Sequence, residues 1–166
     1  MARWTGTWLS GLGAGYGSGD EPRWPGERLG LPADGVGAAA GGGKRAVGLL
    51  LDWLAAGLIA SLFVPPPVYE MTVTEGASGG GYQYQIAAVI AWFAITVPAA
   101  AMFGYTPGMA VAGIRVGRLD GAGTIGLWRA VVRWAMTFLL IPVVIRNVDG
   151  RGLHDRATGT VVITMR

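Results

Sequence analysis

Residues 46–64 read AVGLLLDWLAAGLIASLFV, an apolar stretch of nineteen residues with a single charged residue, Asp52. A helix rises about 1.5 Å per residue, so this stretch predicts a helix of roughly 28 Å, long enough to cross the hydrocarbon core of a membrane. Three prolines follow directly, at 65–67, and proline ends a helix because it lacks a backbone donor. The stretch therefore predicts a first transmembrane helix over about 46–64.

A second apolar stretch covers about 85–103 and carries no charge. Pro98 lies within it, which a membrane helix tolerates. The segment between the two stretches contains Glu70 and Glu75 but no basic residue, as is typical of an outer loop. We therefore predict a second transmembrane helix over about 85–103.

The overall composition agrees with a membrane protein. The chain has 166 residues, of which 52% are hydrophobic and 14% are charged, whereas soluble domains carry roughly 25% charged residues. The mean hydropathy is +0.45. There is no cysteine and one histidine, His154, which excludes a disulfide framework and a cysteine-ligated zinc site. We find no nucleophile triad, metal cluster or cofactor loop, so we expect no enzyme, no cofactor and no metal.

The basic residues border the apolar stretches. A net charge of +3 and a pI of about 9.7 would suit a nucleic-acid binder, but residues 46–114 contain neither Lys nor Arg. This is the positive-inside pattern of a membrane protein. It predicts a multi-pass protein of the cytoplasmic membrane with a cytoplasmic N-terminus, the lipid bilayer as partner and no nucleic-acid partner.

Residues 1–43 are rich in Gly, Ser, Pro and Ala and predict a flexible, Trp-containing cytoplasmic tail. Its glycine-rich run does not complete a G-x-G-x-x-G motif, so it is interpreted as a linker. Trp4, Trp8 and Trp24 are candidate partner-binding residues, and the first two are four apart, as on one helix face. Such side chains suit either the membrane interface or a groove on a partner protein.

The region after the second stretch mixes strand and helix patterns. Residues 112–119 alternate like a strand, Asp120 and Gly121 form a turn signal, and Thr124-Ile125 predicts the returning strand of a small cytoplasmic hairpin. Residues 159–165 also have a strand pattern, and they can pair with this hairpin only if both lie on one side of the membrane.

Residues 126–145 predict a third, shorter helix. Only 134–145 are free of charge, and about twelve apolar residues suit a re-entrant or interfacial segment. A full third crossing would place four arginines outside, against the positive-inside rule; they are Arg146, Arg151, Arg156 and Arg166. We therefore favour a third helix that does not cross and a cytoplasmic C-terminus, with three crossings and an outer C-terminus as the alternative.

The predicted fold class follows from these elements. It is an all-α membrane protein with two transmembrane helices, a third short re-entrant or spanning helix, and a small cytoplasmic β-hairpin or sheet. The membrane domain covers 44–166, after the tail.

Five charged residues lie in or beside the apolar part and form the candidate site: Arg45, Asp52, Arg129, Arg133 and Asp155. An ionised Asp52 facing lipid would cost about 2.5 to 3.5 kcal/mol, so it needs protonation, a partner or a hydrated cavity. Arg45 is seven residues earlier, about 10 Å along the helix and too far for an easy ion pair. We expect Arg129 or Arg133 to pair with Asp52, and Asp155 to pair with Arg45.

Four separated motifs resemble the RDD family of small bacterial membrane proteins, which is named after an arginine and two aspartates. KRAVGLLLD (44–52) resembles its opening R-x6-D helix, and TPG (106–108) with GIRV (113–116) resembles its TPGK…G-(I/L)-R-V stretch. Arg133 matches the arginine at the start of the last helix. GLHDRATGTVV (152–162) resembles the closing L-x-D-x-x-A-G-T-V-V.

The resemblance covers about residues 44–163 and assigns the three family-naming positions to Arg45, Asp52 and Asp155. The chain departs from the pattern at Met109, where lysine is usual, and at Thr158, where alanine is usual.

Two functions stay open at the level of sequence. The favoured one is an accessory or interaction subunit of a cytoplasmic-membrane assembly, either a larger complex or a homo-oligomer, in which the charges hold the helices together. The alternative is an oligomeric cation/proton transporter that uses Asp52, since an intramembrane carboxylate is a functional candidate. The resemblance implies this alternative too, because cation/proton antiport is attributed to some members of the family.

Overall fold

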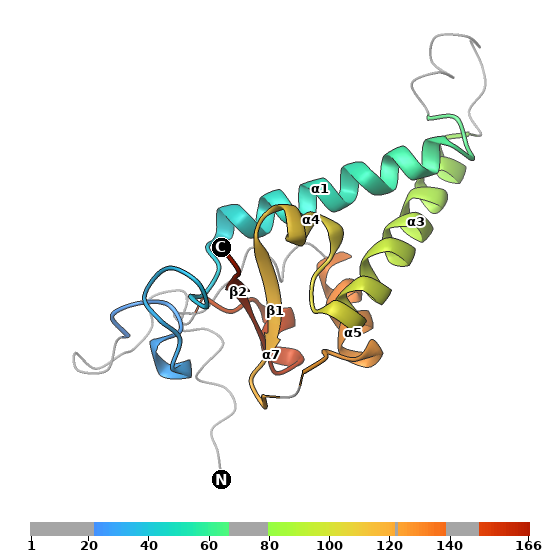
Figure 1. Cartoon of the computed structure of the whole chain (residues 1–166). Helices are drawn as coiled ribbons and strands as arrows, with labels where there is room; N and C mark the ends of the chain where they lie inside the picture. Colours follow the sequence, from blue (N-terminus) through green and yellow to red (C-terminus); the bar gives the residue numbers. More distant parts are fainter. Residues whose placement is uncertain (1–21, 67–79, 122, 139–149) are drawn as a thin grey trace, which may run out of the picture.

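The computed structural model describes residues 22–66, 80–121, 123–138 and 150–166, and this part of the chain is mostly helical (Figure 1). Two long helices meet at one end and diverge, and the shorter elements lie between their diverging ends. The elements, in chain order, are η2 (Glu27–Leu29), α1 (Gly42–Ser61), α3 (Gly80–Phe103), α4 (Pro107–Val111), β1 (Ile114–Arg118), α5 (Leu127–Phe138), α7 (Leu153–Ala157) and β2 (Thr160–Thr164).

The helices α1 and α3 correspond to the two predicted apolar spans. They lie close together at the Ser61 end of α1 and diverge toward the sheet (Figure 1), and the Tyr84 hydroxyl donates a hydrogen bond to the Gly57 carbonyl at 3.0 Å. Small and flat side chains make the contact, with Ala56 packed against Ala91 and Trp92. Both helices begin earlier than predicted, at Gly42 and Gly80.

The outward faces of these helices are covered with exposed, large apolar side chains. They include Leu50, Leu54 and Leu58 on α1 and Ile86 and Ile90 on α3. Within the described residues, Gly81–Phe103 is the one helix with the length and apolar composition to cross a membrane. The helix α1 has 20 residues and contains three charged ones, Lys44, Arg45 and Asp52.

The sheet is two-stranded and antiparallel, and it joins the two predicted strand segments, around 112–119 and 159–165, without the predicted hairpin. β1 pairs with β2, with Ile114 opposite Thr164 and Arg118 opposite Thr160. The prediction of a returning strand at Thr124-Ile125 is wrong: Ile125 is buried against Ile114 in the core below the sheet. β2 pairs five consecutive residues with β1. Five residues make more ladder hydrogen bonds than the two residues Thr124 and Ile125 could make.

Residues 37–40 lie along the other edge of β2. The Gly37 amide donates to the Thr164 carbonyl at 2.9 Å, and the Ala40 amide donates to the Val162 carbonyl at 2.8 Å. These residues belong to the predicted tail, whose residues 1–21 lie outside the described residues.

The helix α5 is the described part of the predicted third helix, and residues 139–145 lie outside the described residues. Its inner face packs Ala130 against Val97 and Ala101 of α3. Its outer face exposes Leu127 and Trp128. The buried side of this helix thus carries an arginine, Arg133, while large apolar side chains lie on its exposed side.

Candidate functional site

Asp155 is the centre of a buried charge cluster. It lies near the start of α7 and is fully buried, and its two carboxylate oxygens accept hydrogen bonds from arginines of two different helices. Arg45 of α1 donates to Oδ2 at 2.6 Å, and Arg133 of α5 donates to Oδ1. The Gly152 amide also donates to Oδ2, at 3.1 Å. One carboxylate therefore joins α1, α5 and α7, and the pairing of Arg45 with Asp155 that the sequence predicts is present.

Further hydrogen bonds from the two arginines reach main-chain and hydroxyl oxygens. Arg45 Nε donates to the Ala40 carbonyl at 3.1 Å, in the segment that borders β2. Arg133 Nη1 donates to the Thr160 hydroxyl at 2.6 Å, at the start of β2. Hydrogen bonds thus connect the sheet to the charge cluster at Asp155. The arginines of this cluster bind partners inside the protein.

The pKa of Asp155 reflects these partners. Burial alone would raise its pKa, but the charges of Arg133, His154 and Arg45 and the hydrogen bond from Arg133 lower it far below the ordinary value. The ionised carboxylate is therefore the stable form of the folded protein at neutral pH.

This shift predicts a loss of stability in acid. A carboxylate whose folded pKa lies below its unfolded pKa, near 3.9, adds stability that is complete above about pH 5 and is lost as the pH falls toward the folded pKa. We expect the free energy of unfolding in detergent to fall between pH 5 and pH 3, and to fall less steeply in Asp155→Asn. Equal slopes in the two proteins would contradict this assignment.

Asp52 has different partners from those predicted. Its Oδ2 accepts a hydrogen bond from the Thr106 hydroxyl, and its Oδ1 accepts one from the Gly108 amide at 2.7 Å. The expectation that Arg129 or Arg133 pairs with Asp52 is wrong. Arg133 binds Asp155, and Arg129 Nε donates to the Thr158 carbonyl at 3.0 Å.

The Thr-Pro-Gly sequence before α4 explains the position of Asp52. Thr106 is the N-cap of α4 and accepts the Met109 amide at 3.2 Å, so its single hydroxyl proton is left for Asp52. Pro107 occupies the first turn, where its missing donor costs nothing. The short helix therefore presents a hydroxyl and an amide to one carboxylate on α1.

Gly108 lets α4 approach the backbone of α1. A Cβ atom on Gly108 would lie 2.1 Å from the Gly48 carbonyl oxygen and 2.9 Å from Cγ of Asp52. Gly48 lies on the same stripe of α1 as Arg45 and Asp52, all buried. Thr106 and Gly108 are site residues that the charge pattern did not find, although the TPG motif marked their position.

The buried charged residues lie within the part of the chain that matches a known protein family. The profile of the RDD family matches residues 39–159, which include Arg45, Asp52, the TPG turn and Asp155. The chain belongs to the RDD family. Separate comparisons with curated proteins and with solved structures give no significant match. In this RDD protein, a membrane protein, Arg45 and Asp155 form an ion pair, while Asp52 binds the TPG turn.

A small cavity lies between the two carboxylate sites of this RDD protein. It has a volume of about 80 Å³ and is bordered by Asp52, Arg133 and Trp134, among other side chains. This is enough space for several water molecules. The Trp134 indole nitrogen is buried and has no hydrogen-bond partner among the described residues, so it offers a donor to any occupant.

Of the candidate partner-binding tryptophans in this RDD protein, only Trp24 lies in the described residues. Its indole nitrogen donates to the Leu31 carbonyl at 2.9 Å, and the Arg23 guanidinium lies 4.9 Å from the ring centre. The polar atom of Trp24 is thus used inside the chain. Trp4 and Trp8 lie outside the described residues.

Proposed function

We propose that this protein is an accessory subunit of a cytoplasmic-membrane assembly and has no enzymatic activity. The observation that carries the proposal is the cluster at Asp155, where Arg45 and Arg133 come from two helices to a carboxylate with no exposed surface. These charges fix the positions of helices. A membrane-embedded scaffold whose ion pairs define its shape suits binding to a larger partner or to further copies of itself.

The topology that we propose has both described ends on the cytoplasmic side. β1 follows α3 directly, and β2 lies beyond the third apolar segment, yet the two strands pair. Residues 37–40, just before α1, border the same sheet. Two crossings by α1 and α3, and a third segment that returns to its own side, agree with this arrangement. Three crossings would separate β2 from β1.

Cysteine labelling tests this topology, and the chain has no native cysteine. We expect Ser61→Cys, at the far end of α1, to react with a membrane-impermeant maleimide added to intact cells. Thr164→Cys, in β2, should react only after the membrane is opened. Reaction of Thr164→Cys in intact cells would overturn the proposed topology.

The accessory role predicts a stoichiometric partner that depends on the N-terminal tail. We expect a deletion of residues 1–21, and the double substitution Trp4→Ala/Trp8→Ala, to release a partner that co-purifies with the full chain in mild detergent. Both variants keep residues 37–40, which border β2, so the fold is retained. Trp24→Phe is the control, because its indole nitrogen is bound within the chain. Purification of the full chain with no stoichiometric partner and no self-association would contradict the proposal.

The cavity beside Asp52 supports a second candidate, cation/proton transport. A carboxylate next to space for water is the arrangement that a proton or cation carrier needs. Cation-driven proton flux in proteoliposomes tests it. Transport requires flux in the wild-type protein that is lost in Asp52→Asn and kept in Asp120→Asn, whose carboxylate is half-exposed. Absence of flux in the wild-type protein would remove this candidate.

A further inference from the structure

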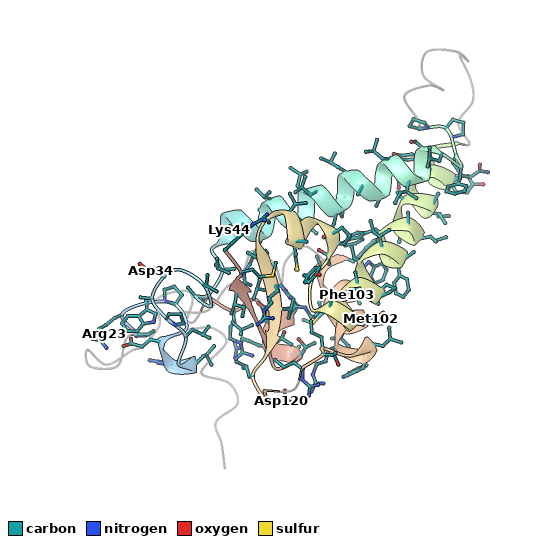
Figure 2. All side chains as sticks on the ribbon, in the orientation of Figure 1. Arg23, Asp34, Lys44, Met102, Phe103 and Asp120 are labelled. Atoms are coloured by element: carbon teal, nitrogen blue, oxygen red, sulfur yellow. The ribbon has the colours of Figure 1, made fainter. Side chains whose placement is uncertain are left out.

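We propose that the cavity between Arg133 and Asp52 binds one small planar oxyanion, of the size of formate or nitrate, on its Arg133 side. The cavity is bordered by residues of α1, α3, α4, α5 and both strands. α3 and α5 are in contact at its wall, before the end of α3 that Met102 and Phe103 mark in Figure 2. The proposal goes beyond both functions considered above.

Arg133 holds Asp155 with only one nitrogen of its guanidinium group. Nη1 donates to the Asp155 carboxylate and, at 2.6 Å, to the Thr160 hydroxyl. Nε and Nη2 form no hydrogen bond with the described residues. These two nitrogens carry parallel N–H groups, which bind two oxygens of a carboxylate or a similar planar anion at once. Arg133 is buried and borders the cavity, so the cavity is the space in which this pair of donors meets an acceptor.

Trp134 adds a further donor beside Arg133 in α5. Its indole nitrogen is buried and has no hydrogen-bond partner among the described residues. Two neighbouring aromatic rings, with centres 5.5 and 5.1 Å away, hold its ring in place. Thr96 and Thr137 also border the cavity, but their hydroxyls donate to carbonyls of their own helices at 2.6 and 2.7 Å. Consecutive residues of α5 thus bring unused donors to one cavity.

The charges around the cavity place an anion near Arg133. Asp155 neutralises only part of the charge of Arg133, because it is shared with Arg45. Asp52 also borders the cavity, and its oxygens accept hydrogen bonds from uncharged groups of the Thr-Pro-Gly turn. Its carboxylate repels an anion, so the ligand binds on the Arg133 side and would bind more tightly without the charge of Asp52.

The size of the cavity limits the ligand. A cavity of about 150 Å³ holds a benzene ring, so a volume of about 80 Å³ suits a ligand of roughly three or four non-hydrogen atoms. Formate and nitrate meet this limit and present two coplanar oxygens to the parallel donors. Gluconate carries the same carboxylate on a chain that is too long for the cavity, which makes it a matched control ligand.

NMR of the indole N–H groups tests the site, with the full chain in mild detergent at constant ionic strength. The chain has seven tryptophans, and the Trp134 signal is the one that disappears in Trp134→Phe. We expect sodium formate and sodium nitrate to shift this signal in a saturable way, whereas sodium gluconate leaves it unchanged. The indole signal of Trp24, which is bound to the Leu31 carbonyl, is the internal control.

Three variants identify the groups that bind formate. Arg133→Lys keeps the positive charge but removes the parallel donors, so we expect binding to weaken about tenfold or more, the effect of one lost charge-assisted hydrogen bond. Arg129→Lys, one turn earlier in α5, is the matched control and should bind as the wild type does, since Arg129 does not border the cavity. Asp52→Asn should bind roughly fivefold more tightly, because a like charge across a small cavity is removed. Unchanged signals of the other tryptophans show that each variant is folded.

Absence of a saturable shift in formate would show that the cavity takes water only, and would overturn the proposal. An equal response to sodium gluconate would do the same, because it would show an effect of the sodium ion or of ionic strength. Unchanged formate binding in Arg133→Lys, or weaker binding in Asp52→Asn, would also contradict the site. The readout needs neither a protein partner nor ion flux, so its failure is distinguishable from failure of the accessory role or of transport.

Discussion

Asp155→Asn is expected to destabilise the folded protein by about 3–5 kcal/mol, the cost of removing one partner from a buried ion pair. The asparagine keeps the shape of the side chain but leaves the guanidinium groups of Arg45 and Arg133 buried without a counter-charge. Chemical unfolding of the purified protein in mixed micelles, followed by tryptophan fluorescence, measures the change.

Asp120→Asn is a matched control for this variant. Asp120 also contacts two arginines, Arg118 and Arg129, but its side chain is 51% exposed. Water screens such a surface cluster, so we expect a loss of at most about 1 kcal/mol. Similar losses of unfolding free energy in Asp155→Asn and Asp120→Asn would show that burial does not determine how much a charge cluster stabilises the protein.

Gly108→Ala is expected to destabilise the protein by about 3 kcal/mol or more, at the upper end of the range for overpacked interiors. The new methyl group would lie 2.1 Å from the Gly48 carbonyl oxygen, and a backbone oxygen cannot move aside as a side-chain end can. The helix α4 must then separate from α1, which also breaks the hydrogen bond from the Gly108 amide to Asp52. The same unfolding measurement applies.

Gly43→Ala is the control for this substitution. A Cβ on Gly43 meets no atom within 4 Å, and alanine is the better helix former, so we expect a gain of up to about 1 kcal/mol. If Gly108→Ala also unfolds like the wild type, the close approach of α4 to α1 is not required for stability.

The long helices were predictable because their signal is local. The apolar runs that contain Leu50 and Ile90 need only length and composition to be recognised, and the amphipathic segment around Arg133 needs only its periodicity. The pairing of Arg45 with Asp155 was predictable from the charge pattern, because an arginine too far along its helix from Asp52 needs a carboxylate from another segment.

The partners of Asp52 were not predictable from the charge pattern. The charge pattern predicted a cationic partner, whereas the fold satisfies this carboxylate with a hydroxyl and an amide from a turn 54 and 56 residues later in the chain. Thr106 and Gly108 carry no charge, and their role depends on the tertiary contact between α1 and α4. The returning strand expected at Thr124-Ile125 failed for a related reason, because the local turn signal at Asp120 suggested a partner nearby. The pairing with the strand pattern at 159–165, which the sequence also allowed, is the one that forms.

The sheet and the Asp155 cluster have a consequence for synthesis. Arg45 is made 110 residues before its partner Asp155, and residues 37–40 are likewise made long before their partner Val162. The helix α1 is therefore made before its arginine can pair with Asp155, and the buried cluster can form only after residue 155 has been added. A chain that stops short of residue 155 lacks both the carboxylate that Arg45 and Arg133 share and the strand that pairs with β1, so its charged interior and its sheet are incomplete together.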